Sequence, residues 1–178
     1  MREIIKYGLI LGLICFLASS VLAIVNNITE PIIKLQKENQ ESSALKEVMA
    51  ESISFKPHYQ DEKIMYWTAF DSNNSLNGLV LKCQAKGFSS TIEILAGLNL
   101  HLEITNIKII SQNETPNLGT RILEASFLGQ FRAKNLDSLS QVQAITGATI
   151  SSRALINALK LRLFELKEQL TQELANAR

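Results

Sequence analysis

A glycine turn joins a polar segment to a long amphipathic run at Thr146-Gly147-Ala148-Thr149-Ile150-Ser151-Ser152. Glycine adopts backbone conformations that other residues avoid, and it lets the main chain approach a ligand closely. Hydroxyl side chains follow where a helix would begin. The unpaired N–H groups and the macrodipole at such a helix start favour a phosphate. The same pattern is also ordinary helix capping, so a phosphate site and a plain cap both remain open from this stretch alone.

The residues after this turn predict a helix from Ser151 to Ala175. Apolar residues recur there in steps of three and four, and charged residues occupy the other positions. The apolar positions are Ile156, Leu159, Leu163, Leu166 and Leu170. We expect this stripe to cover one face of a sheet.

Short segments rich in β-formers precede the turn and predict four strands. They are Lys63–Phe70, Gly78–Ala85, Thr91–Ala96 and Leu102–Ile110. The short gaps between them favour an antiparallel sheet, in which Trp67 and Phe70 are expected in the core. The polar loop 111–123 follows, then one or two short helices within 120–131, then a short strand or extended segment at 136–145. Strands followed by helices predict an α+β fold, with an antiparallel sheet packed against helices.

The N-terminus carries an uncharged apolar run of 19 residues, Tyr7 to Val25. As a helix it would extend ~28 Å, about the hydrocarbon thickness of a bilayer. We therefore expect one N-terminal transmembrane helix. Arg2 and Lys6 precede it, so the positive-inside rule places the N-terminus in the cytoplasm and the rest of the chain outside. A cleaved signal peptide is the alternative interpretation of the same run.

Three regions are predicted: a transmembrane anchor at 1–26, a helical stalk at 27–56 and a soluble domain at 57–178. The stalk helix is expected to begin near Pro31, with Thr29 as its cap, because proline fits the first turn of a helix. The predicted location is the cytoplasmic (inner) membrane, crossed once, with the soluble domain on the periplasmic or extracytoplasmic side.

Composition and motifs exclude several classes of function. A net charge of +1 without a basic run argues against nucleic acid as a partner. The two cysteines, Cys15 and Cys83, lie in an apolar run and a predicted strand, so no disulfide is expected. No spacing typical of metal ligands is present, and neither histidine sits in a motif that would supply the base for a hydroxyl nucleophile. We predict no metal site and no catalytic residue.

Three segments together resemble the FMN-binding domain of two respiratory membrane complexes. That domain is found in the G subunit of the Rnf-type ion-translocating electron-transport complex, and in the C subunit of the sodium-translocating NADH:quinone reductase. The family has an SGAT or TGAT signature before a helix, here Thr146-Gly147-Ala148-Thr149. Its ETPGLG loop corresponds to Glu114-Thr115-Pro116-Asn117-Leu118-Gly119, and its FxxQFxGK helix to Phe127–Lys134. The single membrane span also matches, and the compact length favours the Rnf-type G subunit.

Three positions depart from the family pattern. Asn117 stands where the loop usually has glycine, and asparagine tolerates the left-handed conformation well after glycine. Gln112 occupies a position often held by histidine. Gln143 stands near a position where the flavinylation motif often carries aspartate, which bears on recognition by the modifying enzyme.

The resemblance implies a covalent cofactor. In the family the last threonine of the signature carries FMN through a phosphoester, and a separate flavin transferase attaches it from FAD outside the cytoplasmic membrane. That threonine is Thr149. The other implied cofactor-binding residues are Thr146, Gly147, Ala148 and Ser151 around the phosphate, and Glu114, Thr115, Leu118 and Gly119 beside the flavin ring. Helix capping by Ser151 and Ser152, and a plain surface turn at 114–119, are the alternatives.

The implied role is one-electron relay within a membrane complex. The chain would exchange electrons with other membrane and redox subunits, contact membrane lipid through its anchor, and have no turnover of its own. Whether it counts as an enzyme therefore stays open. The alternative is a membrane-tethered assembly or regulatory domain that lacks covalent flavin.

Overall fold

The computed structural model describes residues 2–60 and 63–176, and it divides into two compact units between Gln40 and Glu41. The helices are α1 (Arg2–Val48), α2 (Ala125–Leu128) and α3 (Thr149–Asn176). The strands are β1 (Ser54–Gln60), β2 (Lys63–Phe70), β3 (Leu76–Lys86), β4 (Thr91–Leu98) and β5 (Ile104–Ser111). Short 3₁₀ helices lie at Gly119–Leu123, Gly129–Phe131 and Ser138–Gln141.

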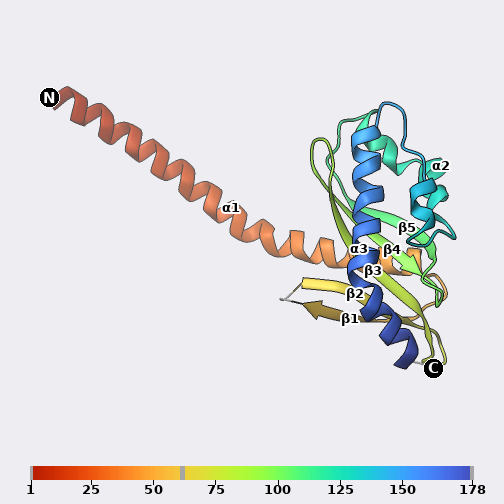
Figure 1. Ribbon diagram of the computed structural model, residues 1–178. Coiled ribbons are helices and arrows are strands. Elements are labelled where there is room, and N and C mark those ends of the chain that lie inside the picture. The colour runs from red at the N-terminus through yellow and green to blue at the C-terminus, as the bar shows by residue number, and fades with distance from the viewer. Residues whose placement is uncertain (1, 61–62, 177–178) are drawn as a thin grey trace. The chain divides into compact units, whose positions relative to one another are not determined.

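The five strands form one sheet in the order β1-β2-β3-β4-β5, and every neighbouring pair is antiparallel. The helices α2 and α3 follow the sheet in the chain (Figure 1). The predicted α+β fold with an antiparallel sheet is thus confirmed. The strand predicted at Lys63–Phe70 is present with the same bounds, and the other three predicted strands are present with shifted ends.

The fifth strand, β1, was missed because Pro57 suggested a boundary. Proline cannot donate to a sheet ladder, so it is confined to edge strands and strand starts. β1 is an edge strand, and Pro57 lies opposite Trp67 of β2 within it. The expected strand or extended segment at 136–145 is also wrong in part, because Ser138–Gln141 is a 3₁₀ helix.

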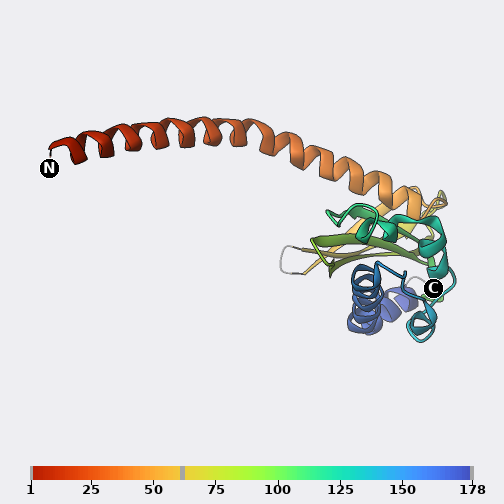
Figure 2. The same cartoon turned by 90° about the horizontal axis from the view of Figure 1, so that it is seen from above.

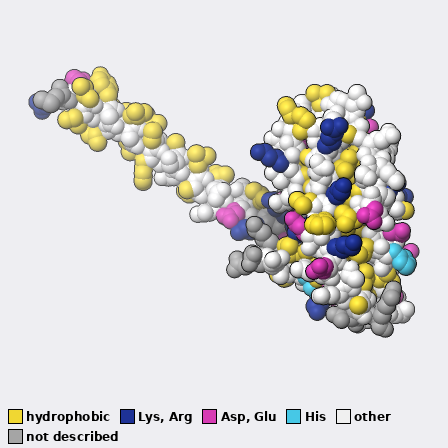
Figure 3. Space-filling view, viewed as in Figure 1, with side chains coloured by type: hydrophobic (Ala, Val, Ile, Leu, Met, Phe, Trp, Pro, Cys, Tyr) yellow, Lys and Arg dark blue, Asp and Glu magenta, His cyan; other side chains and the backbone are white. Residues whose placement is uncertain are grey.

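The helix α1 is apolar over its N-terminal part, where its side chains are exposed. An 18-residue window in it has a mean hydropathy of 2.6, and it is the one helix in the described part of the chain that is long and apolar enough to cross a membrane. Figure 3 shows hydrophobic side chains distributed along it. Such exposure is typical of a helix whose solvent is lipid.

The expected helix start near Pro31 is wrong, since α1 runs without interruption from Arg2 to Val48. The hydroxyl of Thr29 donates to the carbonyl of Val25 at 2.9 Å, one turn back, instead of capping a new helix. Proline inside a helix removes one backbone hydrogen bond, which a long helix tolerates at a cost. The region boundaries at 26/27 and 56/57 stay predictions; residues 41–53 fall in the same compact unit as the sheet.

The two faces of the sheet are covered by different helices. Alternate residues of β3 point to opposite faces: Leu79 and Leu81 join one apolar cluster, and Val80 joins another. The first cluster contains the buried face of α3 and the second contains Leu45 and Val48 from the last turns of α1. Figure 2 shows α3 lying along one side of the sheet.

The second cluster also holds Trp67, which is 4% exposed, so its predicted place in the core is confirmed. Phe70, expected there too, is half-buried at the end of β2.

Candidate functional site

The predicted turn and helix start lie at the N-terminus of α3. Gly147 has a φ of +85°, the left-handed region that glycine favours. The turn closes by a bond from the Ala148 N–H to the Ile145 carbonyl at 3.0 Å. α3 then begins at Thr149, two residues before the predicted start.

Ser152 lies in the first turn of α3 and ties it to the preceding segment. Its hydroxyl donates to the Ala148 carbonyl at 2.8 Å and accepts from the Ile145 N–H at 3.2 Å. The side chain is fully buried. Ser152 therefore fixes the turn to the helix. Capping in the usual sense is not its role, since its hydroxyl accepts the N–H of Ile145, which precedes α3.

The Thr149 side chain is exposed at the first residue of α3. Its hydroxyl makes one long contact, to the Ile145 carbonyl at 3.4 Å. The turn just before it is held in place as well, since the Arg121 guanidinium donates to the Thr146 carbonyl at 2.9 Å and pairs with Glu124 at 2.8 Å. A fixed backbone thus presents an accessible hydroxyl.

Glu114, by contrast, is 5% exposed and fully engaged. Its carboxylate accepts the backbone N–H groups of Phe88, Ser89 and Ser90 at 3.1, 3.1 and 2.9 Å. It also accepts the hydroxyl of Ser90 at 3.1 Å and that of Ser151 at 2.5 Å. Burial alone would raise the pKa of Glu114, but these hydrogen bonds outweigh it and hold the pKa below its usual range.

Two glycines leave room for this carboxylate. A Cβ on Gly87 would lie 2.5 Å from Glu114 Oε1, and a Cβ on Gly119 would lie 2.6 Å from Oε2. Both distances are far inside van der Waals contact. The glycine that ends the ETPNLG loop is therefore required by the packing of the glutamate that begins it.

Asn117, in the middle of that loop, has a φ of +60°. The expected left-handed conformation at this departure from the family pattern is confirmed. Its N–H donates to the Thr120 hydroxyl at 3.0 Å, which closes the loop.

A depression of about 300 Å³ lies between the two loops and the start of α3. Its lining includes Thr115, Leu118, Gly119, Gly147, Ala148, Thr149 and Ser151 among the predicted residues, together with Phe88 and Ile150. Of the remaining predicted residues, Glu114 lies buried behind the lining and Thr146 is exposed in the adjoining turn. Segments far apart in the sequence thus meet at one cavity.

Phe88 and Ile150 were missed by the sequence analysis. They are 69% and 57% exposed, and with Leu118 at 51% they give the cavity an apolar rim. Phe88 lies in the tight turn between β3 and β4, closed by a bond from the Gly87 N–H to the Ser90 carbonyl at 2.9 Å. A phenylalanine in such a tight turn cannot reach the core. This feature of the sequence could have identified Phe88 as a candidate site residue.

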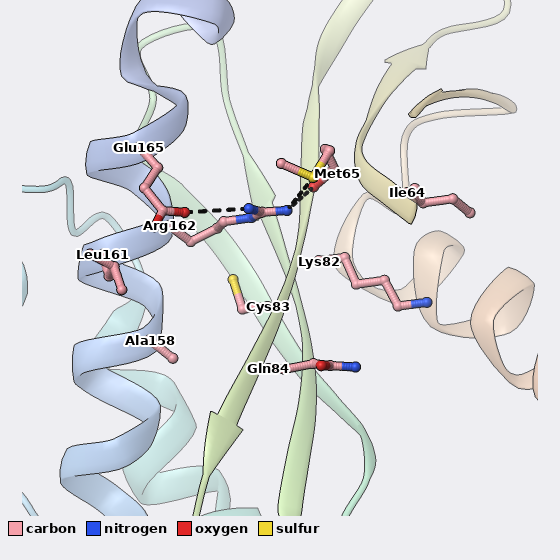
Figure 4. Close-up of a pocket in the computed structure, with 9 residues that line it drawn as sticks. All are labelled: Ile64, Met65, Lys82, Cys83, Gln84, Ala158, Leu161, Arg162 and Glu165. Atoms are coloured by element: carbon pink, nitrogen blue, oxygen red, sulfur yellow. Dashed lines mark hydrogen bonds and ion pairs between the residues drawn. The ribbon is translucent and has the colours of Figure 1, made fainter. Parts of the chain in front are cut away.

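A larger hollow of about 570 Å³ lies elsewhere, between β2, β3 and α3 (Figure 4). None of the predicted site residues lines it. Arg162 of α3 reaches across it to the Met65 carbonyl at 3.5 Å and pairs with Glu165 at 3.4 Å. Burial raises the pKa of the Cys83 thiol there to about 12, so this thiol is no nucleophile at neutral pH. The chemistry of the lining residues therefore favours the cavity of about 300 Å³ as the functional site, although the hollow that contains Cys83 is larger.

The residues that line the smaller cavity would suit the phosphate end of FMN and part of its ring. An exposed hydroxyl lies at the N-terminus of a 28-residue helix, where the macrodipole favours an anion. A Cβ built on Gly147 would meet nothing within 4 Å, so the space in front of the turn is open. The exposed apolar rim suits a flat aromatic ring, because ligand sites are mostly apolar with a few placed polar groups.

Comparison with known families defines the class of the domain. Residues 87–163, from the β3–β4 turn into α3, match the FMN-binding domain. Residues 1–48, which correspond closely to α1, match the RnfG N-terminal region. The crystal structure of Shewanella oneidensis NqrC superposes with a TM-score of 0.54 at 18% identity, covering 72% of this chain and 74% of that one, and supports the same fold.

Two relatives extend the match to nearly the whole chain. The G subunit of the ion-translocating oxidoreductase complex of Methanosarcina acetivorans is 31% identical, over 89% of this chain and 92% of its own length. The G subunit of the proton-translocating ferredoxin:NAD(+) oxidoreductase complex of Clostridium ljungdahlii is 28% identical, over 90% and 88%. The chain belongs to the G-subunit family of ion-translocating oxidoreductase complexes.

Proposed function

We propose that this chain is a membrane-anchored flavoprotein subunit that relays electrons through FMN bound covalently to Thr149. The observation that carries the proposal is the exposed Thr149 hydroxyl, which lines the cavity at the first residue of α3. The match of residues 87–163 to the FMN-binding domain supports the choice of cofactor.

The chain's own groups suit a phosphoester at this position. The first N–H groups of α3 have no partner within the helix, and with the macrodipole each such interaction stabilises the retained phosphate charge by roughly 0.3–1 kcal/mol. Gly147 and Ala148 keep the approach to the hydroxyl clear. FMN, when bound, supplies the redox chemistry, while the protein fixes its position and surroundings.

The ring end of the cofactor would lie against the ETPNLG loop. Thr115 and Leu118 line the cavity there, and Leu118 is half exposed. An apolar wall of this kind shields one part of a flavin from water.

Anchoring and orientation are part of the proposal. The apolar part of α1 would cross the cytoplasmic membrane once, with Arg2 and Lys6 on the cytoplasmic side and the FMN-binding domain outside. Membrane lipid, the other subunits of an ion-translocating complex and a flavin transferase are the implied partners. The names of the two relatives, both G subunits of oxidoreductase complexes, support other subunits of such a complex as partners.

The decisive measurement is mass spectrometry of full-length protein from a host with an active flavin transferase. We expect added mass equal to FMN less one water on the peptide that contains Thr149. Thr149→Val should abolish the addition, whereas Thr171→Val, which alters an exposed threonine of α3 outside the cavity lining, should retain it. A colourless wild-type protein of unmodified mass would refute the covalent flavin and favour the assembly or regulatory alternative.

A further inference from the structure

Three segments that line the cavity converge on a single carboxylate. Glu114 receives backbone N–H groups from the β3–β4 turn, which contains Phe88, and a hydroxyl from the first turn of α3. Additional bonds tie the same turn to the Glu114 loop. The Asn113 N–H donates to the Ser90 hydroxyl at 2.8 Å, and the hydroxyls of Ser89 and Thr115 lie 3.0 Å apart.

This engagement leaves Glu114 no capacity to bind a cofactor directly. Both of its oxygens already accept hydrogen bonds, and the side chain lies behind the cavity lining. Ser151 is committed as well, because its one hydroxyl proton goes to Glu114 Oε2 at 2.5 Å. The side chains of these two residues therefore influence a ligand through the groups that they hold in place.

Phe88 is the group that this arrangement places at the cavity. Its backbone N–H is fixed by Glu114, yet its side chain is 69% exposed and lines the depression together with Thr149 and Ile150. Exposing a phenylalanine on a tightly bonded turn forgoes burial of a large apolar surface. A flat apolar ring bound in the cavity would restore that burial.

We propose that Phe88 contacts the flavin ring, and that Glu114 is the positioning residue that holds Phe88 and the first turn of α3 around it. The proposal rests on the function proposed above and adds two roles to it. A carboxylate suits the positioning role because all its lone pairs accept, whereas an amide would present two N–H donors to groups that are donors themselves.

The contact is tested by Phe88→Ala in flavinylated full-length protein. We expect covalent FMN to remain at the wild-type ratio, since Thr149 is untouched. The visible circular dichroism of the flavin should fall, and iodide should quench its fluorescence more strongly. Phe164→Ala is the matched control, because Phe164 is also 69% exposed but lies on α3 away from this cavity. Unchanged dichroism and quenching in Phe88→Ala would overturn the contact.

The positioning role is tested by Glu114→Gln, with Glu93→Gln of β4 as the control. Amide hydrogen exchange at residues 88–90 should accelerate about tenfold or more in Glu114→Gln, because charge-assisted bonds to three N–H groups are lost. The flavin dichroism should change in the same direction as in Phe88→Ala. Exchange at wild-type rates in Glu114→Gln would overturn the role, and so would a changed exchange with unchanged dichroism.

Covalent FMN on Thr149 and the roles of Phe88 and Glu114 are refuted by different results. Absence of covalent FMN from the wild-type protein refutes the function proposed above. Wild-type flavin stoichiometry together with an indifferent Phe88→Ala variant refutes only the present inference. Exchange measurements on the 88–90 turn can be read in either case, since they need no flavin.

Discussion

The two loops that meet at the cavity are built in opposite ways. In the 112–119 loop Glu114 is 5% exposed and its carboxylate accepts five hydrogen bonds. In the 146–149 turn Thr149 is exposed, and its hydroxyl makes one contact of 3.4 Å. The carboxylate of Glu114 is fully occupied by hydrogen bonds within the protein. The hydroxyl of Thr149, the proposed acceptor of FMN, keeps its oxygen available. A buried, fully bonded motif residue is therefore a poor candidate for a ligand even when it lies beside the site.

The largest test of this contrast compares Glu114→Ala with Thr149→Ala. Removing the buried carboxylate takes the acceptor from three backbone N–H groups and two hydroxyls, so we expect a loss of about 3 kcal/mol in the free energy of unfolding. Thr149→Ala removes one long contact at the surface and should cost less than about 0.5 kcal/mol. Urea denaturation of both variants in detergent, followed by tryptophan fluorescence of the buried Trp67, measures the difference.

The matching flavin measurement should give the reverse order of effects. Thr149→Ala should lose all covalent flavin, and any Glu114→Ala that folds should retain some. Equal losses of unfolding free energy in the two variants would contradict the view that Glu114 fixes the structure whereas Thr149 contributes little to it.

The sequence did not reveal this difference between a buried, bonded Glu114 and an accessible Thr149. The motif resemblance brought the two loops together, and periodicity gave α3 and four strands. Neither could tell that the carboxylate of Glu114 is buried and bonded within the protein, because its partners include backbone N–H groups of the distant turn 88–90. Backbone donors carry no residue identity, so no pattern of side chains announces them.

Two of the wrong predictions about the fold also have local causes. From the sequence, Pro57 suggests a boundary before the strands and Pro31 suggests the first turn of a helix, because both are common positions for proline. One lies inside an edge strand and the other inside a long helix. In each place the surrounding structure tolerates a missing N–H, at the edge of the sheet or at the cost of one helical bond. Propensity alone cannot weigh that tolerance.

The second test uses the two motif glycines, which the structure requires for different reasons. A Cβ on Gly119 would lie 2.6 Å from Glu114 Oε2 and 2.7 Å from its Cβ, against a side chain that cannot move without losing its bonds. We expect Gly119→Ala to destabilise the domain by about 2 kcal/mol. Gly147→Ala meets no atom within 4 Å but must adopt a φ of +85°, which costs about 1 kcal/mol.

The same variants also separate steric from conformational origins. In Gly119→Ala a second change, Glu114→Gln, should be less harmful than in the wild type, because the two effects share one contact. In Gly147→Ala the effect of Glu114→Gln should be additive. Denaturation of the single and double variants measures both couplings, and additivity at Gly119 would contradict the packing explanation.

The smallest effect concerns pH, and it belongs to the 112–119 loop alone. Because hydrogen bonding lowers the pKa of Glu114 in the folded protein, the unfolded state binds its proton more readily. The resulting stabilisation is fully present above the ordinary value of 4.5 and is lost as pH falls through the lower, folded pKa. The difference in unfolding free energy between wild type and Glu114→Gln should therefore be constant near neutrality and shrink below about pH 4.5.

The groups that lower the pKa of Glu114 also determine how its pH dependence responds to salt. Every group bonded to the Glu114 carboxylate is neutral: three backbone N–H groups and the hydroxyls of Ser90 and Ser151. Salt screens interactions between exposed charges, whereas hydrogen bonds to a buried carboxylate are affected far less. The pH dependence should thus persist in about 0.5 M salt, and Thr149→Val should retain it in full. A dependence that disappeared with salt would indicate a cation near Glu114, and the loop would then be held by charge pairing.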